Sequence, residues 1–410
     1  MKLKLLTKRV ILGEYYMRCV GTVVRGIRTP IIKENDDLAT IVVESLMNAK
    51  ESENIEFRDK DVVAITEAVV GISEGNYVTV DDVAQDVQNK FPSKKIGVVC
   101  PILSRNRFSI VLKGIARGMD EITLLTTFPA DEVGNGILDE DVLDKSKYDL
   151  SSVISEEEYF ETFGSWVHPF TGINMVEFYK ELIESEDCKV EFVFSNDIKT
   201  ILDYKTDVLT CDIHTRERSK KILKNEGATV YGLHDILTES IGDSGCNPDY
   251  GLLGSNKATE EKLKLFPKTG DKLVNEVQKR LIELTGKQIE VMVYGDGAFK
   301  DPVGKIWELA DPVVSPAYTS GLEGTPNEIK LKYVSDNKFA DLKGDELKEA
   351  IKEEIKHKDQ DLTGQMITQG TTPRRLTDLI GSLCDLTSGS GDKGTPVIFI
   401  QGYFDNLAND

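Results

Sequence analysis

The chain has 410 residues, of which 40% are hydrophobic and 29% are charged, as in an ordinary folded protein. Fifty Lys and Arg against seventy Asp and Glu give a formal net charge of −20, which opposes sequence-independent attraction to nucleic acid or anionic lipid. An anionic substrate would then need divalent cations to mediate its binding. The six cysteines form no Cys-x-x-Cys pair, which favours reduced thiols in a reducing compartment.

The amino terminus, MKLKLLTKRVILGEYY, is basic and apolar but lacks the small-residue cleavage site of a signal peptide. No uninterrupted apolar run is long enough to span a membrane. We therefore expect a cytoplasmic protein with neither a membrane nor a nucleic acid as partner. The length predicts two or three domains.

Two units are predicted in the first 75 residues. Asp36 or Asp37 caps a helix that runs to about residue 49, whose apolar residues recur at three- and four-residue spacing. Residues 61–75, DVVAITEAVVGISEG, are predicted to form a β-branched buried strand that ends in a polar turn. Glu74 would lie at the exit of this strand, where functional side chains gather in α/β sheets.

The middle of the chain alternates short apolar runs with helical patterns. Buried strands are predicted at residues 96–100, 122–126, 190–194, 208–211 and 228–231. Residues 216–225 form a helix that Gly227 closes. This order predicts a three-layer α/β domain with a parallel sheet. No GxGxxG fingerprint accompanies it, so the sequence does not support a dinucleotide site there.

Near the carboxyl terminus, residues 369–402 place an amphipathic helix, a Gly-, Ser- and Asp-rich loop and a buried strand in that order. The loop Ser388–Gly394 offers backbone N–H groups, one carboxylate and one ammonium, a combination that can cradle phosphate or hold a metal bridging to phosphate. It lacks the GxxxxGK[ST] order of a Walker A loop. The alternative is a flexible turn between helix and strand.

Four segments, in this order, resemble the F420-0:gamma-glutamyl ligase family. They read TPIIKENDDL, DVVAITEAVVGISEG, RLIELTGKQIEVMVYGDG and DLIGSLCDLTSGSGDKGTPVIFIQG. The resemblance covers about residues 1–90 and 235–410. It implies an α+β, gamma-glutamyl ligase-like fold built from residues 1–95 and 238–410, with residues 96–237 as an inserted three-layer α/β domain. It also implies GTP, or ATP, as co-substrate, and Mg²⁺ or Mn²⁺ as metal.

The resemblance places nucleotide contacts on two segments and metal contacts on three aspartates. The nucleotide contacts fall on Thr29, Pro30, Ile31 and Ile32, and on Ser388, Gly389, Ser390, Gly391, Asp392, Lys393 and Gly394. The metal contacts fall on Asp296, which follows a predicted strand at 289–294, and on Asp249 and Asp301. A structural turn is the alternative role for Asp296. No residue is assigned a catalytic role.

The chain departs from the family at positions that matter for these contacts. Leu253 stands where the family carries a metal-binding aspartate, and Ile72 stands where it carries a lysine. Glu67 and Ala68 stand where the family has small hydroxyl residues. These changes remove side chains that the family uses near its nucleotide and metal.

Three hypotheses follow. The first is a nucleotide- and metal-dependent ligase that adds glutamate in gamma linkage to a coenzyme F420-0-like acceptor. The second is a nucleotide- or metabolite-binding homologue without catalysis, and the third is the same ligation on a different acceptor. The expected partners are a nucleotide, glutamate, an anionic acceptor and, by the resemblance, a second copy of the chain in a homodimer.

Overall fold

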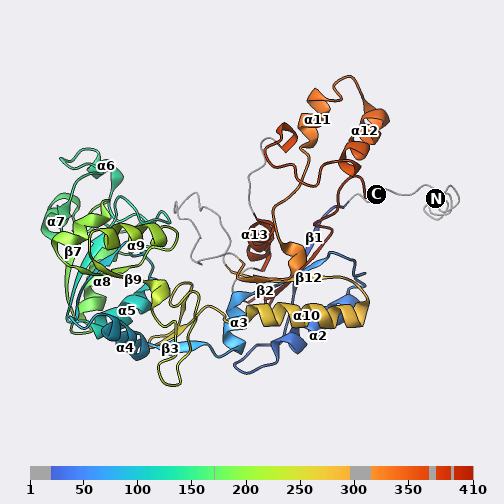
Figure 1. Ribbon diagram of the computed structural model, residues 1–410. Coiled ribbons are helices and arrows are strands. Elements are labelled where there is room, and N and C mark those ends of the chain that lie inside the picture. The colour runs from blue at the N-terminus through green and yellow to red at the C-terminus, as the bar shows by residue number, and fades with distance from the viewer. Residues whose placement is uncertain (1–19, 170, 296–314, 369–374, 389–391, 410) are drawn as a thin grey trace.

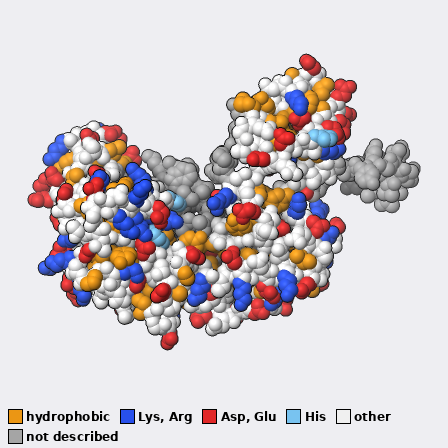
Figure 2. Space-filling view, viewed as in Figure 1, with side chains coloured by type: hydrophobic (Ala, Val, Ile, Leu, Met, Phe, Trp, Pro, Cys, Tyr) orange, Lys and Arg blue, Asp and Glu red, His pale blue; other side chains and the backbone are white. Residues whose placement is uncertain are grey.

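The computed structural model describes residues 20–169, 171–295, 315–368, 375–388 and 392–409. Three parts are visible in Figure 1: a middle unit built on a parallel sheet, a second unit that joins both ends of the described chain, and a smaller helical part that carries α11 and α12. Charged side chains of both signs are spread over the visible face (Figure 2). None of the helices in these ranges has the length and apolar character that crossing a membrane requires.

The second unit is organised on a five-stranded mixed sheet. In spatial order its strands are β1 (Val23–Ile27), β14 (Val397–Gln401), β2 (Val62–Thr66), β12 (Glu290–Tyr294) and β13 (Ala317–Tyr318). β14 runs antiparallel to both β1 and β2, and β2 runs parallel to β12. The last strand of the chain therefore lies between the first two.

Helices cover both faces of this sheet, as the alternation of side chains along β2 requires. Val63 and Ile65 pack against α2 (Leu38–Ser52) and α10 (Gly270–Thr285), whereas Val62 and Ala64 pack against α13 (Leu376–Ser388). The short helix α3 (Glu67–Ser73) continues directly from β2.

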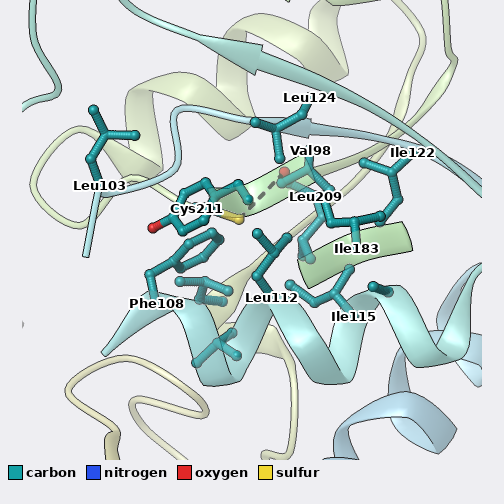
Figure 3. Close-up of a cluster of buried hydrophobic side chains, with 14 of the residues drawn as sticks. Val98, Leu103, Phe108, Leu112, Ile115, Ile122, Leu124, Ile183, Leu209 and Cys211 are labelled. Carbon is teal, nitrogen blue, oxygen red and sulfur yellow. Dashed lines mark hydrogen bonds between the residues drawn. The ribbon is translucent and has the colours of Figure 1, made fainter. Parts of the chain in front are cut away.

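The middle unit has six strands, of which all but β6 run parallel. Their spatial order is β6 (Ile154–Ser155), β7 (Lys189–Phe194), β5 (Glu121–Thr126), β4 (Lys95–Val99), β8 (Asp207–Thr210) and β9 (Thr229–Gly232). One face carries α4 (Val80–Lys90), α5 (Phe108–Gly118) and α8 (Met175–Glu184), and the other carries η1 (Ile198–Asp203) and α9 (Arg216–Asn225). Figure 3 shows Phe108, Leu112 and Ile115 of α5 directed at the sheet.

A small antiparallel sheet connects the two units. It consists of β10 (Asn256–Thr259), β11 (Lys262–Lys264) and β3 (Tyr77–Thr79), and β3 leads directly into α4. The remaining helices are α6 (Glu140–Leu143), α7 (Glu156–Phe163), α11 (Leu331–Asn337), α12 (Gly344–Lys356) and the 3₁₀ helices η2 (Leu233–Asp235), η3 (Ser320–Leu322) and η4 (Met366–Thr368).

The structure confirms the α+β class and most of the predicted elements. The Asp37 carboxylate caps α2 by accepting the Thr40 N–H at 3.1 Å. Each strand predicted in the middle unit occurs within one residue of its predicted limits, and α9 has the predicted limits. The division of the chain after residues 95 and 237 into domains stays a prediction.

The prediction that Glu74 lies at a strand exit is wrong. β2 ends at Thr66, and residues 67–73 form α3, so that Glu74 is the residue that follows a helix. The strand ends there because the Thr66 N–H donates to the carbonyl of Pro396, whose own nitrogen carries no hydrogen to extend the ladder. The Glu74 carboxylate instead accepts the N–H groups of Lys268 and Thr269, each at 2.9 Å.

Close packing of α4 on α5 gives a test of the middle unit. A Cβ at Gly114 would lie 2.6 Å from the Val83 Cβ. Gly114→Ala should therefore lower stability by ~1–3 kcal/mol through overpacking, even though alanine favours a helix over glycine. Thermal unfolding followed by circular dichroism measures this. Gly21→Ala is the control, because nothing lies within 4 Å of that site; a stabilised Gly114→Ala protein would contradict the packing.

Candidate functional site

Two adjoining cavities form where the loop after β1 meets the loop before β14. These loops contact each other through the Thr29 N–H, which donates to the Gly394 carbonyl at 3.3 Å. The first cavity has a volume of about 1070 Å³, and we call it the basic cavity. Its charged lining residues are Arg25, Arg28, Lys393 and Glu53.

The second cavity, with a volume of about 450 Å³, lies on the other side of the loop after β1, and we call it the acidic cavity. It carries the carboxylates of Glu67 and Asp385, and no Lys or Arg is among its described lining residues. The other lining residues are Thr29, Pro30, Ile31, Ile32, Thr66, Ala68, Val69, Asn256, Ser388, Gly394, Thr395 and Pro396.

The two cavities share Thr29, Pro30 and Thr395, so these residues form the boundary between them. Arg28 and Lys393, on the basic side, are exposed and form no ion pair with any described residue. Arg25 donates to Gln401 at 2.6 Å along the sheet edge. The site thus places unpaired positive charge and buried negative charge on opposite sides of one narrow boundary.

A buried ion pair lies at the wall of the acidic cavity. Lys264, the last residue of β11, places its Nζ 3.0 and 3.2 Å from the two carboxylate oxygens of Glu67, the first residue of α3. Their side chains are only 8% and 7% exposed. Moving two charged groups out of water costs free energy unless they pair with each other. The contact with Lys264 therefore holds the Glu67 carboxylate in one position.

Tyr294, at the end of β12, brings a third polar group to the same region. The residue is 1% exposed, and no described residue completes a hydrogen bond with its hydroxyl. Burial raises its pKa, while the nearby Ser388 and Thr66 side chains act in the opposite direction. Ser388 and Thr66 both line the acidic cavity, whereas Tyr294 itself is packed in the core beneath α13.

The residues predicted to contact a nucleotide divide between the two cavities. Residues 29–32, Ser388 and Gly394 line the acidic cavity, and Lys393 lines the basic one. Ser388 is the last residue of α13 and not part of the loop, and Asp392 is exposed and lines neither cavity. Gly389, Ser390 and Gly391 lie outside the described residues. The structure therefore brings the two predicted segments together, from opposite ends of the sequence.

Of the three residues predicted to contact a metal, the structure describes only Asp249. Asp249 is an exposed turn residue that lines neither cavity, and its N–H donates to the Asn247 side chain at 3.0 Å. Asp296 and Asp301 lie outside the described residues. Among the described residues, no group of three or more His, Cys, Asp or Glu is placed to hold a metal ion. These residues alone do not fit a divalent metal.

Leu253 and Ile72, the two residues that depart from the family pattern, both pack in apolar cores. Leu253 is 1% exposed and belongs to the apolar core of the middle unit, next to a small cavity of about 40 Å³. Ile72 packs against the core that α2 and α10 form with the mixed sheet. Neither position lines the basic or the acidic cavity.

Sequence reasoning missed the charges that distinguish the two cavities. Arg28 directly precedes the predicted segment 29–32, and this proximity in sequence is a signal that could have identified it. Glu67 was noted only as a departure from the family. Its partner Lys264 lies 197 residues away, and no local pattern connects the two.

The fold is that of an α+β protein, and its two adjoining cavities have volumes of the order that small-molecule ligands occupy. A sequence profile of the family described as F420-0:Gamma-glutamyl ligase matches residues 26–402. The chain therefore belongs to the F420-0:gamma-glutamyl ligase family. The matched range includes the middle section, which the resemblance seen in the sequence did not cover. A comparison with curated proteins finds no match.

The buried ion pair gives a test of the site. Lys264→Met leaves the Glu67 carboxylate buried without its counterion and should destabilise the protein by ~3–5 kcal/mol. The double variant Lys264→Met/Glu67→Gln removes both charges and should recover most of this loss. Urea unfolding followed by fluorescence compares the three proteins. Equal stability of the single and double variants would contradict the expectation that the unpaired Glu67 carboxylate causes the loss.

Proposed function

We propose that this protein is a nucleotide- and metal-dependent ligase that adds glutamate in gamma linkage to a coenzyme F420-0-like acceptor. The observation that carries the proposal is the pair of adjoining cavities at which residues 29–32 meet the segment from Ser388 to Gly394. The family match supports the reaction class. GTP is the expected nucleotide, with ATP as the alternative, and a homodimer is the expected assembly.

The proposed chemistry requires charges of both signs close together. The acceptor carboxylate takes the γ-phosphoryl group to form an acyl phosphate, and the nucleotide diphosphate leaves. The glutamate nitrogen then bonds to the acyl carbon, and the carbon–oxygen bond to phosphate breaks. In this scheme Arg28 and Lys393 bind the phosphates in the basic cavity, where charge-assisted hydrogen bonds to phosphate are strong. Binding holds the reacting groups in place, which lowers the entropy cost of the reaction.

We propose that Asp296 and Asp301, which follow β12 in the sequence, bind the metal ion. A divalent ion would neutralise phosphate charge and align the transferred group. Asp249, the third predicted ligand, lines neither cavity.

A second function deserves a test because of two specific substitutions. Leu253 and Ile72 replace a metal-binding aspartate and a lysine of the family, and both side chains pack in apolar cores. These changes favour a homologue that binds a nucleotide or metabolite without catalysing ligation. A ligase acting on a different acceptor is the third alternative.

Nucleotide binding is tested by calorimetric titration with GTP and then ATP, each with and without Mg²⁺ or Mn²⁺. We expect metal-dependent binding that Arg28→Ala and Lys393→Ala each weaken about 10-fold, because each removes a charged contact to phosphate. Lys33→Ala is the matched control, since Lys33 is an exposed cation that lines neither cavity. Equal affinity in all four proteins would remove the basic cavity from the nucleotide site.

Turnover separates the first two functions. Phosphate release in the presence of glutamate and coenzyme F420-0 supports the ligase, whereas metal-dependent nucleotide binding without release supports the non-catalytic homologue. Release with other carboxylate acceptors alone would favour the third alternative.

The metal ligand is tested by Asp296→Asn, which should weaken Mn²⁺ binding about 10-fold by removing one anionic oxygen ligand. Unfolding should be unchanged. Asp249→Asn, made in parallel, decides whether Asp249 contributes at all. Unchanged Mn²⁺ affinity in the Asp296→Asn protein, measured by calorimetry, would remove Asp296 from the site.

A further inference from the structure

The basic cavity follows the edge strand β1 and has two chemically different ends. The first end lies past Ile27, where the loop after β1 meets the loop before β14, and it carries the cations Arg28 and Lys393. The second end lies where α2 ends, and there the Glu53 side chain lines the cavity. A ligand that fills the cavity therefore meets positive charge at one end and a carboxylate at the other.

Contacts of the segment that leaves α2 show how far apart these ends are. The Glu56 carbonyl, three residues past Glu53, accepts the side-chain amide of Gln401 at 2.9 Å. Gln401 pairs with Val23, the first of the five residues of β1, so α2 ends near the start of that strand. Arg28 directly follows the other end of β1. A strand of this length separates the two ends by roughly 13 Å.

The carboxylate at the second end is not neutralised by the chain. Glu53 is exposed, and its side chain forms no ion pair or hydrogen bond with any residue that the structure describes. Arg25, the third cation of the cavity lining, donates instead to Gln401 at 2.6 Å. The carboxyl end of α2 adds the negative end of the helix dipole. This end of the cavity therefore repels phosphate and favours groups that donate hydrogen bonds.

Two neutral polar side chains of α2 line the cavity ahead of Glu53. Ser45 and Asn48 are three residues apart and therefore lie on the same face of the helix. Ser45 is only 8% exposed, and its hydroxyl forms no hydrogen bond with the described part of the chain. Buried hydroxyls have partners in the great majority of cases, so the partner of Ser45 must come from within the cavity. The Asn48 amide offers both donors and an acceptor.

A guanine nucleotide matches this division of charge. Its phosphates are anionic, whereas guanine presents two adjacent donors, N1–H and the 2-amino group, beside the acceptor O6. One carboxylate can accept both donors while an amide N–H donates to O6. Adenine has an unprotonated N1 at the corresponding position, and the lone pair of this nitrogen would face the carboxylate.

We propose that the basic cavity binds GTP lengthwise, with its guanine at Glu53 and its phosphates at Arg28 and Lys393. Glu53 accepts the guanine N1–H and 2-amino group, and Asn48 donates to O6. The proposal rests on the nucleotide-dependent ligase function above, and it adds the residue that selects GTP over ATP. It places the selecting carboxylate on α2, outside the two loops that contact the phosphates.

The first test compares four ligands by calorimetric titration of the full-length protein with Mg²⁺: GTP, ITP, ATP and inorganic tripolyphosphate. GTP should bind at least 10-fold more tightly than ATP, because hydrogen bonds to a charged group are among the stronger ones. ITP, which keeps N1–H but lacks the 2-amino group, should fall between them. Equal affinities for GTP and ATP would overturn the proposal, and equal affinities for GTP and ITP would contradict the contact with the 2-amino group.

A matched pair of variants then locates the base. Glu53→Gln should bring the affinities for GTP and ATP within about 3-fold of each other, because an amide can donate to adenine N1 as well as accept from guanine. Glu56→Gln makes the same change of charge at an exposed residue that does not line the cavity, and it should keep the full preference. Tripolyphosphate should bind both variants equally. A full preference for GTP in the folded Glu53→Gln protein would overturn the role of Glu53.

The outcomes separate this proposal from the one on which it rests. Binding of GTP, ATP and tripolyphosphate with equal affinity contradicts the base contact and leaves the ligase proposal standing. A preference for GTP that Glu53→Gln abolishes, in a protein that releases no phosphate with any acceptor, supports the base contact and contradicts the ligase. A protein that binds none of the four ligands contradicts both proposals.

Discussion

The position of β14 between β1 and β2 determines where both cavities form. Because β14 pairs antiparallel with each neighbour, the loop that precedes it must run beside the loop that follows β1. The hydrogen bond from the Thr29 N–H to the Gly394 carbonyl joins these loops. Every described residue that the cavities share belongs to one of the two loops, so the site depends on a strand pairing between opposite ends of the chain.

The meeting of these two loops also concentrates positive charge in a chain that is negatively charged as a whole. A chain with a formal net charge of −20 repels anionic ligands at long range, so any affinity for an anion would have to come from cations placed close to it. Arg28 and Lys393 are such cations, and both belong to the two loops that β14 brings together. Glu67 and Asp385 belong instead to helices α3 and α13, which follow β2 and precede β14. The sheet topology thus places these cations in one cavity and these carboxylates in the other, and the two cavities share Thr29, Pro30 and Thr395.

Much of the fold follows from local patterns, because apolar spacing and capping residues act over a few neighbours. The Asp37 cap and the strands of the middle unit are examples. The prediction failed at Glu74, because the β-branched run 61–75 has no internal signal for the end of a strand. That end is set by Pro396, which is distant in sequence. The Glu67–Lys264 pair could not be predicted from local patterns either, because its two residues are 197 positions apart in the sequence. Only the fold brings them together.

Leu253, which the sequence resemblance aligns with a metal-binding aspartate of the family, belongs to a segment from Leu252 to Lys264 that runs from one unit to the other. Leu252 and Leu253 are buried in the core of the middle unit, whereas Asn256, three residues further on, lines the acidic cavity. The β10–β11 hairpin then returns Lys264 to Glu67. A carboxylate at position 253 would lie among apolar side chains, where its charge would be unstable, and not in the cavity. In this chain the two leucines anchor the segment in the core, and Lys264 at its end forms the buried ion pair with Glu67.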